Sequence, residues 1–478
     1  MTIVATLINA PALERQVPKN PMAIITEIGN GHIGAGEPWS RVDFANVAQM
    51  VAAGCRRYPS VPAVIFDDGM TIGREQLLLR ARAFAGYLLR HSVKGERVAV
   101  MLENRIECMI IFIAALLTER ILVTINPDSK SFDGLHVLRN SGSVIIVTSV
   151  AKEELALRLK GECPALRLIL TLRDPEPDGL RPFTADGGLP QPEICQATRK
   201  SAATVYYTSG STGLPKGCVL GHEWWLRLCD IHLRTTPVQD DYRPLCCVPF
   251  HYADSMFQLL CALHMGGTLI AMRRFSVSRF WALVAQYGVT EIYLLASMPT
   301  LLLKQAAHPL ERQHKLRIAV CSPVPKTAHQ NLVERFGVQF IDSYGTTEAG
   351  WNVRTPWRIA GKMVGSGSMG TAVPETVLRI VDKTGNAAAV GEIGELLVRG
   401  PGLFLGYLND PAATCQALRD GWYHTGDLVR SDDQGLLYFI GRMNDVVRRS
   451  GETVSAAESA MESPTISSRV FLNFQSFW

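Results

Sequence analysis

Residues 205–217 read Val-Tyr-Tyr-Thr-Ser-Gly-Ser-Thr-Gly-Leu-Pro-Lys-Gly, an apolar start followed by small, hydroxyl-bearing residues and one lysine. We predict that a β-strand leads into a loop here. Glycines let the backbone approach a ligand closely, and successive N–H groups in such a loop form a concave site for anions. The hydroxyls of Ser209, Ser211 and Thr212 can donate hydrogen bonds, and Lys216 supplies a positive charge. The segment predicts a phosphate-binding loop; an ordinary polar surface loop is the alternative.

The lysine of this loop does not fit the Walker A pattern. That pattern requires Gly-Lys followed by Ser or Thr, whereas Lys216 lies between Pro215 and Gly217. We therefore expect a phosphate loop of another class.

On both sides of the loop, apolar patterns of helical and strand type alternate. Arg74–His91 has apolar residues at helical spacing. Short apolar runs predict strands at 98–102, 144–148, 168–171, 291–295, 317–321 and 339–342. Such alternation predicts an α/β fold in which helices pack on sheets. Residues 376–440 instead carry short strands separated by turn signals, which predicts a small β-rich subdomain.

Composition restricts the classes of function. A net charge of +4 over 478 residues is too small to favour nucleic acid or an anionic membrane as the main partner. The 11 cysteines follow no CxxC pattern, which favours free thiols in a reducing compartment. The apolar stretch Cys108–Leu117 is about half the ~20 residues that a membrane span needs, and the N-terminus lacks a signal-peptide pattern. We predict a cytoplasmic protein without a membrane span.

The run Tyr207–Gly217 resembles the signature loop of the adenylate-forming superfamily, which includes acyl-CoA synthetases, and further motifs extend the resemblance over about 41–458. It implies a large N-terminal domain of two stacked α/β sheet subdomains, with the small β-rich subdomain at about 376–440. It also implies that the loop binds the β- and γ-phosphates of ATP. The loop residues concerned are Thr208, Ser209, Gly210, Ser211, Thr212, Gly213 and Lys216.

A second motif, Asp342-Ser-Tyr-Gly-Thr-Thr-Glu348, is similar to the second core motif of the superfamily. The resemblance implies that Glu348 holds Mg²⁺, which prefers oxygen ligands, that Thr347 contacts the α-phosphate and that Tyr344 stacks on adenine. It also places Ser343, Gly345 and Thr346 at the nucleotide. A polar turn is the alternative.

Two later motifs imply contacts to the sugar. Gly421-Trp-Tyr-His-Thr-Gly-Asp427 resembles the segment whose aspartate binds the ribose hydroxyls, which a carboxylate can do by accepting a hydrogen bond from each of them. The segment 441–452 resembles the hinge of the superfamily, in which Arg442 would contact ribose or phosphate. Asn444 stands where relatives usually carry Asp or Lys.

The acid side of the site is implied by two further segments. Pro249-Phe-His-Tyr252 resembles the aromatic motif beside the acyl pocket, so His251 would orient the carboxylate; a structural role is the alternative. Amino-acid adenylation domains carry Asp where this chain has Tyr252, which argues against an α-amino acid, although Asp254 lies nearby. Ser322-Pro323 replaces the usual Gly-Gly pair, and Ser322 is counted with the nucleotide contacts.

The function implied by the resemblance is ATP-dependent activation of a carboxylic acid, with coenzyme A as the expected acyl acceptor. The catalytic residues would be Lys216, Thr347, Glu348 and His251, with ATP, Mg²⁺ and coenzyme A as the small molecules bound. The spacing from His251 to Thr268 is similar to that of carnitine and crotonobetaine ligases. Transfer to an amine, a carrier protein or another nucleophile is one alternative, and a nucleotide-binding remnant with little turnover is another.

The domain boundaries that we predict are an N-terminal extension at 1–40, an adenylation domain at 41–441, and a hinge with an incomplete C-terminal domain at 442–478. The last residues, Ser459–Trp478, do not resemble the mobile C-terminal domain of the superfamily. We therefore expect a truncated domain that supports adenylation weakly and thioester formation more weakly still.

Overall fold

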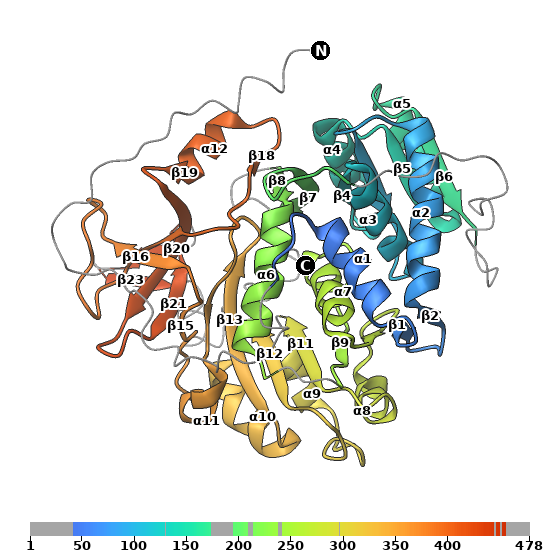
Figure 1. Cartoon of the computed structure of the whole chain (residues 1–478). Coiled ribbons are helices and arrows are strands. Elements are labelled where there is room, and N and C mark those ends of the chain that lie inside the picture. The colour runs from blue at the N-terminus through green and yellow to red at the C-terminus, as the bar shows by residue number, and fades with distance from the viewer. Residues whose placement is uncertain are drawn as a thin grey trace.

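The computed structural model describes residues 42–129, 131–173, 195–208, 214–237, 241–295, 297–443, 446–449 and 452–455. Two large β-sheets alternate with three layers of helices, and a smaller sheet lies at one side of them (Figure 1). This arrangement confirms the predicted α/β fold class with a β-rich subdomain. The predicted N-terminal extension and the residues after 455 lie outside the described residues.

The first large sheet contains the two strands that flank the phosphate loop. Helices cover both of its faces, which explains why its central strands are nearly continuous apolar runs. In spatial order the strands are β18 (Gly406–Tyr407), β8 (Lys216–Gly221), β7 (Ala202–Thr208), β4 (Ile121–Thr124), β3 (Arg97–Met101), β5 (Ile145–Ser149) and β6 (Leu168–Leu172). The last five strands in this order are parallel to one another, and β8 and β18 are antiparallel strands at one edge of the sheet.

The second large sheet contains the second core motif. In spatial order the strands are β15 (Thr371–Ala372), β14 (Gly350–Arg354), β13 (Gln339–Thr346), β12 (Ile318–Ser322), β11 (Glu291–Leu295), β9 (Pro244–Cys246), β10 (Leu269–Ala271), β1 (Pro62–Phe66) and β2 (Thr71–Gly73). The six strands from β13 to β1 in this order are parallel, so their carboxyl ends lie along the same edge of the sheet, which is the usual place for a ligand in such sheets.

Five helices fill the space between the two sheets and form the central core. One of them, α3, is apolar on every side because protein surrounds it completely, as expected for a buried helix. Among the described residues, no helix combines the length and apolar character needed to cross a bilayer. The five are α1 (Val47–Arg57), α2 (Arg74–His91), α3 (Ile106–Thr118), α6 (His222–Thr235) and α7 (Ala253–Met265).

The guanidinium of Arg74 ties three of these central helices together. It is fully buried and donates hydrogen bonds to the carbonyls of Gly54, Ala262 and Leu263, at 3.1, 3.1 and 2.8 Å. The last two carbonyls lie in the final turn of α7, where unpaired carbonyl groups favour a positive charge. Arg74 therefore fixes how α2 packs against α1 and α7.

The outer helices form two smaller cores against the outer faces of the sheets. The first large sheet is covered by α4 (Ser131–Ser141) and α5 (Glu153–Gly161), with the 3-10 turn η1 (Val150–Lys152) between them. The second is covered by α8 (Val277–Gln286), α9 (Met298–Lys304) and α10 (His329–Phe336), followed by α11 (Ala360–Met363) and two 3-10 turns, η3 (Lys326–Ala328) and η4 (Trp357–Ile359).

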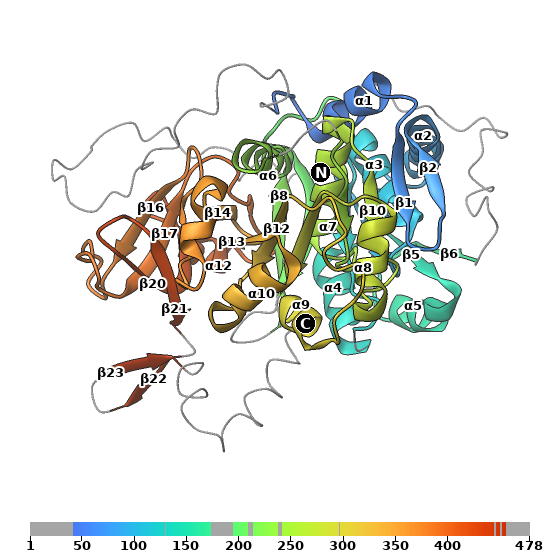
Figure 2. The ribbon, with the colours of Figure 1, turned by 90° about the horizontal axis from the view of Figure 1, so that it is seen from below.

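The smaller sheet corresponds to the β-rich region expected from the sequence, and Figure 2 shows it beside the large sheets from below. It contains β16 (Val377–Val381), β17 (Gly394–Arg399), β20 (Trp422–Ser431), β19 (Leu418–Arg419) and β21 (Leu437–Arg442), with α12 (Pro411–Ala417) before β19. Between β17 and α12 the chain returns to the first large sheet, where β18 pairs with β8. A final hairpin is formed by β22 (Val446–Arg449) and β23 (Glu452–Ser455).

Candidate active site

The two ends of the predicted phosphate loop are adjacent strand residues. Thr208 ends β7 and Lys216 begins β8, and the two residues pair directly across the antiparallel ladder. The strand pairing therefore brings the two ends of the loop together. The five residues between them for which we predict phosphate contacts lie outside the described residues, so that prediction stands untested: Ser209, Gly210, Ser211, Thr212 and Gly213.

A tyrosine joins Lys216 to Glu348. The hydroxyl of Tyr407 in β18 donates a 2.7 Å hydrogen bond to Glu348 Oε1, and Lys216 Nζ lies 5.2 Å from the centre of the Tyr407 ring. Burial, together with the nearby carboxylate, raises the pKa of Tyr407 far above its usual value, so the phenol keeps its proton. The first and second motifs thus meet at one aromatic side chain.

A second junction joins the second core motif to the smaller sheet. The Tyr344 hydroxyl donates a 2.6 Å hydrogen bond to Asp427 Oδ2, and Arg442 Nε lies 3.2 Å from Asp427 Oδ1. Burial raises the pKa of the Asp427 carboxyl above its usual range, and Arg442 opposes that shift. Asp427 Oδ1 has no partner with hydrogen-bond geometry among the described residues, so it can accept a hydrogen bond from a ligand. The prediction that Tyr344 stacks on adenine is untested.

The hairpin between β13 and β14 carries the rest of the second motif. Thr346 Oγ1 donates to the Tyr423 hydroxyl at 3.4 Å, and Thr347 lies half-buried in the turn that follows. Any side chain at Gly345 would approach the carbonyl oxygen of Gly350 to 2.3 Å, so only glycine fits there. The motif is therefore a strand end and a tight turn. The phosphate contact of Thr347 stays a prediction.

Ser322, the last residue of β12, lies beside Ser343 within β13. The Ser322 hydroxyl donates to the Ser343 carbonyl, and the Tyr293 hydroxyl lies 3.3 Å from Ser322 Oγ. The Ser343 hydroxyl is fully buried and has no hydrogen-bond partner among the described residues. Asp342 points the other way, where its Oδ2 accepts the N–H of Val324 at 2.8 Å, and burial raises its pKa to about 7.

His251 lies in the turn between β9 and α7, between the two large sheets. Its carbonyl accepts the Thr124 hydroxyl at 3.1 Å, and its ring lines a small cavity of about 10 Å³ with Thr124, Phe250 and Met256. Burial lowers its pKa to about 4, which makes the ring neutral at pH 7. Within the described residues no hydrogen bond joins this ring to the tyrosine junctions, so its predicted role toward the carboxylate is untested.

Three tyrosines at the site were not singled out from the sequence: Tyr293, Tyr407 and Tyr423. Tyr423 lies inside the motif 421–427 that we quoted, but its contact to Thr346 depends on the pairing of two distant strands. Tyr407 follows Gly406 in a region without a recognisable motif. No sequence signal marks Tyr407 or Tyr293, because their partners are 59 and 29 residues away along the chain.

The side chains at the site fit a magnesium nucleotide. No group of three or more His, Cys, Asp or Glu side chains able to hold a metal ion occurs in the part of the chain that the structure describes. Mg²⁺ in nucleotide sites usually takes one or two carboxylates and completes its ligand shell with phosphate oxygens and water. Glu348, which is 9% exposed, can supply one such carboxylate.

Comparison with known proteins identifies the family. The sequence profile of the family described as "AMP-binding enzyme" matches residues 51–408. The chain belongs to the AMP-binding enzyme family. This match covers the two large sheets, the junction of Lys216, Tyr407 and Glu348, and the hairpin of the second motif. The predicted membership of the adenylate-forming superfamily is thereby confirmed.

Two curated relatives of this AMP-binding enzyme are ligases. The 4-coumarate–CoA ligase of Pinus taeda is 28% identical over 399 residues, covering 80% of this chain and 73% of the relative. The crotonobetaine/carnitine–CoA ligase of Escherichia coli O157:H7 (strain EC4115 / EHEC) is 30% identical over 382 residues, covering 76% and 72%. The prediction of an enzyme of the AMP-forming acid–thiol ligase type is confirmed by these family relations.

Solved structures show the same fold. The O-succinylbenzoate coenzyme A synthetase of Bacillus subtilis, in complex with AMP, superimposes with a TM-score of 0.76 at 24% identity, covering 87% of this chain and 83% of that one. The fatty acyl CoA synthetase of Mycobacterium tuberculosis gives 0.75 at 22% identity, covering 87% and 82%. At these identities the likeness concerns the fold alone.

Proposed function

We propose that this AMP-binding enzyme joins a carboxylic acid to AMP and then passes the acyl group to coenzyme A. In the first step a carboxylate oxygen attacks the α-phosphorus of ATP, pyrophosphate leaves, and an acyl-adenylate forms. In the second step the thiol of coenzyme A displaces AMP. The observation that carries the proposal is that contacts through two tyrosines join three separate motifs. Lys216 and Glu348 both lie against Tyr407, and Asp427 accepts a hydrogen bond from Tyr344.

Both reactants of the first step are anions, so the site must offset their repulsion. Lys216 would contribute a positive charge at the phosphates, and the N–H groups of residues 209–213 would add oriented dipoles. Mg²⁺ bound by Glu348 would neutralise part of the phosphate charge. The Asp427 carboxylate would accept hydrogen bonds from the ribose hydroxyls, which fixes the nucleotide for in-line attack.

The roles proposed for the remaining motif residues follow from their places. Thr347 lies in the turn beside Glu348, within the motif assigned to the α-phosphate, and Tyr344 lies beside Asp427 where adenine and ribose would bind. Arg442 would contact ribose or phosphate from the other side of Asp427. His251, neutral at pH 7, would orient the acid as a hydrogen-bond partner without adding charge.

We also propose that residues 41–441 form the adenylation domain and that the enzyme acts in the cytoplasm. All 11 cysteines are free, and ten of them are buried as small core side chains. Free cysteines in this number are usual in a reducing compartment. Coenzyme A as the acceptor is supported by the relatives, two of which are named as CoA ligases.

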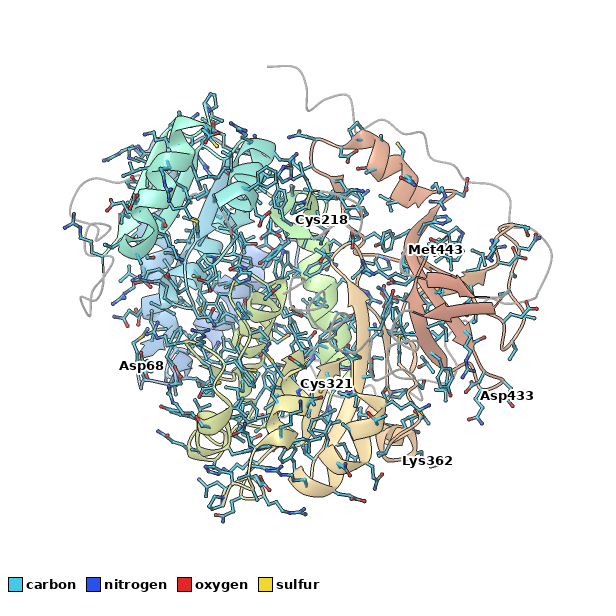
Figure 3. All side chains as sticks on the ribbon, turned by 180° about the vertical axis from the view of Figure 1, so that it is seen from behind. Asp68, Cys218, Cys321, Lys362, Asp433 and Met443 are labelled. Carbon is cyan, nitrogen blue, oxygen red and sulfur yellow. The ribbon has the colours of Figure 1, made fainter. Side chains whose placement is uncertain are left out.

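The test of the first step is acid-dependent exchange of labelled pyrophosphate into ATP, measured with a panel of fatty, aryl and small polar acids. We expect Lys216→Met to lower the exchange rate at least about a hundredfold, as loss of a preorganised charged donor does. Lys362→Met is the matched control, because Lys362 is an exposed lysine on α11, away from the site (Figure 3). Absence of exchange with every acid, or normal exchange by Lys216→Met, would contradict the proposal.

The second step is tested on the preformed acyl-adenylate. Coenzyme A and simple amines are offered separately, and thioester or amide is measured by mass. We expect the thioester with coenzyme A. Formation of amide alone would assign a different acceptor while leaving the first step intact.

A further inference from the structure

A cavity lined by charged side chains lies on one face of α6 and shares no residue with the candidate active site. Its volume is about 290 Å³, the size of a site for a small metabolite. Four charged residues of α6 line it at helical spacing: Glu223, Arg227, Asp230 and Arg234. Other parts of the chain complete the wall with Val42, Asp43, Arg199, Glu375 and Pro401.

Asp230 connects the three arginines of this cavity. Its Oδ2 lies 3.3 Å from Nη1 of Arg227 and 3.3 Å from Nη1 of Arg234, so these two guanidinium groups are neighbours. Its Oδ1 accepts the N–H of Val42 at 3.4 Å, and the Val42 carbonyl accepts a hydrogen bond from Arg199 Nη2 at 3.3 Å. One short chain of contacts therefore gathers three guanidinium groups at the cavity.

Most hydrogen-bond donors of these arginines are unused. Within the described residues each arginine makes its contacts through a single terminal nitrogen, which is Nη1 in Arg227 and Arg234 and Nη2 in Arg199. Arg227 is 7% exposed, yet its Nε and Nη2 have no hydrogen-bond partner there. A guanidinium group presents its donors as a planar fork that matches the oxygens of phosphate and carboxylate groups. The wall of the cavity therefore suits an anion with several oxygens.

The carboxylates at the cavity leave this preference in place. The side chains of Asp43 and Glu375 are 95% and 57% exposed, so water and salt screen much of their charge. The more enclosed carboxylates are those of Asp230 and Glu223, which face the three arginines. The enclosed part of the cavity thus has an excess of positive charge.

Glu375 contacts two of the arginines as a bound anion would. Its Oε1 lies 2.9 Å from Arg234 Nη1, and its Oε2 lies 3.3 Å from Arg227 Nη1. The backbone of Glu375 has a φ of 59°, in the left-handed region that residues other than glycine rarely adopt. Because this side chain is more than half exposed, it can turn into water when another anion takes its place. Glu375 is therefore an internal competitor for the cavity.

We propose that this cavity binds a small polyanion, a molecule with phosphate or carboxylate groups, which Arg199, Arg227 and Arg234 hold in place of Glu375. The site is separate from the nucleotide site, because none of its lining residues belongs to the phosphate loop or to the later nucleotide motifs. It requires no step of the proposed acid activation. Glu375 lies just before β16, so a bound anion would replace a contact between α6 and the region of the smaller sheet.

The test is calorimetric titration of the full chain with inorganic phosphate, pyrophosphate and citrate, in a buffer low in chloride and free of Mg²⁺. The three anions distinguish phosphate from carboxylate ligands. We expect at least one of them to bind, and this binding to persist in Lys216→Met, in which the proposed phosphate loop has lost its charge. Persistence would assign the binding to a site other than that loop.

Two variants of the cavity should change the affinity in opposite directions. Arg234→Gln should weaken binding about tenfold or more, as loss of a charged hydrogen-bond donor does. Glu375→Gln should tighten binding about threefold, because it removes a competing carboxylate of an exposed ion pair. Arg317→Gln is the matched control, since Arg317 is 29% exposed, as Arg234 is, and forms a 2.7 Å ion pair with Asp241.

Several outcomes would overturn the inference. They are no binding of any of the three anions, binding that disappears in Lys216→Met, and an affinity of Arg234→Gln equal to that of the parent protein or of Arg317→Gln. If Arg234→Gln does not fold, Glu375→Gln decides the matter, because a purely structural ion pair predicts no gain in affinity when it is removed. The proposed acid activation is measured separately by pyrophosphate exchange and stands or falls independently of these results.

Discussion

Tyr407 connects the two charged groups that the site needs most. Its hydroxyl donates to Glu348 Oε1 at 2.7 Å, while its ring faces Lys216 at 5.2 Å. The tyrosine can therefore hold the carboxylate in place without neutralising it, and it keeps the lysine near the phosphate loop. A positioning role of this kind depends on one oxygen atom, so it can be tested by removing that atom alone.

We expect Tyr407→Phe to reduce acid-dependent pyrophosphate exchange about tenfold, because a hydrogen bond to a charged acceptor contributes about 1.5–3 kcal/mol. The loss should appear mainly in the Mg²⁺ concentration needed for half-maximal rate. Tyr438→Phe is the control, since Tyr438 makes a similar 2.9 Å hydrogen bond to Asp432 in a turn of the smaller sheet. Equal effects of the two variants would show that Tyr407 acts only on folding.

At the scale of the elements, α1 packs closely against α7 in the central core. Gly54 of α1 faces the backbone of α7 so closely that an added Cβ would lie 2.4 Å from the carbonyl oxygen of Leu263. The same carbonyl accepts a hydrogen bond from Arg74. Arg74 also donates to the Gly54 carbonyl at 3.1 Å, so α1 and α7 cannot move apart without losing one of these two hydrogen bonds.

Gly54→Ala should therefore lower the free energy of unfolding by about 2–3 kcal/mol, in the range for an overpacked core. Gly161→Ala, at the end of α5, meets nothing within 4 Å and should be neutral or slightly stabilising, because alanine favours helix. Denaturant midpoints of the two variants and the parent protein measure the difference. A Gly54→Ala protein as stable as the parent would show that α1 can move away from α7.

At the scale of the whole molecule, the pH dependence of stability is set in part by a buried histidine that stays neutral in the helix layer between the two large sheets. His222, at the start of α6, is 1% exposed, and its Nδ1 accepts the N–H of Val47 at 3.2 Å. Burial lowers its pKa from 6.5 to about 4. Between these values the unfolded chain binds a proton that the folded protein does not, so stability falls as pH decreases.

We expect the titration of His222 alone to reduce the free energy of unfolding by about 3 kcal/mol as the pH falls from 6.5 to 4. His222→Asn keeps a neutral acceptor for Val47 and should flatten the acid side of the pH–stability curve, even if it lowers stability at pH 7. His91→Asn removes an exposed histidine as the control. Unfolding curves at several pH values decide the matter: an unchanged slope in His222→Asn would contradict the expectation.

The boundary between the large and small sheets is also a property of the whole molecule. Figure 3 places Cys218 of β8 and Met443, just after β21, on the two sides of this boundary. Asp427 comes from the small sheet and Tyr344 from the large one, and their 2.6 Å hydrogen bond crosses between them. The nucleotide site that we propose therefore requires both parts of the fold to be in place.

The sequence alone determined the local features of this protein. The apolar period of Arg74–His91 was sufficient to predict α2, and the apolar runs at 291–295 and 339–342 were sufficient to predict β11 and the start of β13. Helix and strand periods can be read in this way because they depend on neighbours in the chain. The order of small residues and lysine in 205–217 sufficed to indicate a phosphate loop and its family. The residues between Thr208 and Leu214 lie outside the described residues, so their contacts stay predictions.

Only the tertiary structure decided which side chains meet. Tyr407 reaches Glu348 because β18 leaves the small-sheet region to pair with β8, and Asp427 reaches Tyr344 because two sheets pack edge to edge. These two contacts join residues 59 and 83 positions apart along the chain. Local patterns carry no information about such distances, because strand order and layer packing arise only when the whole core forms.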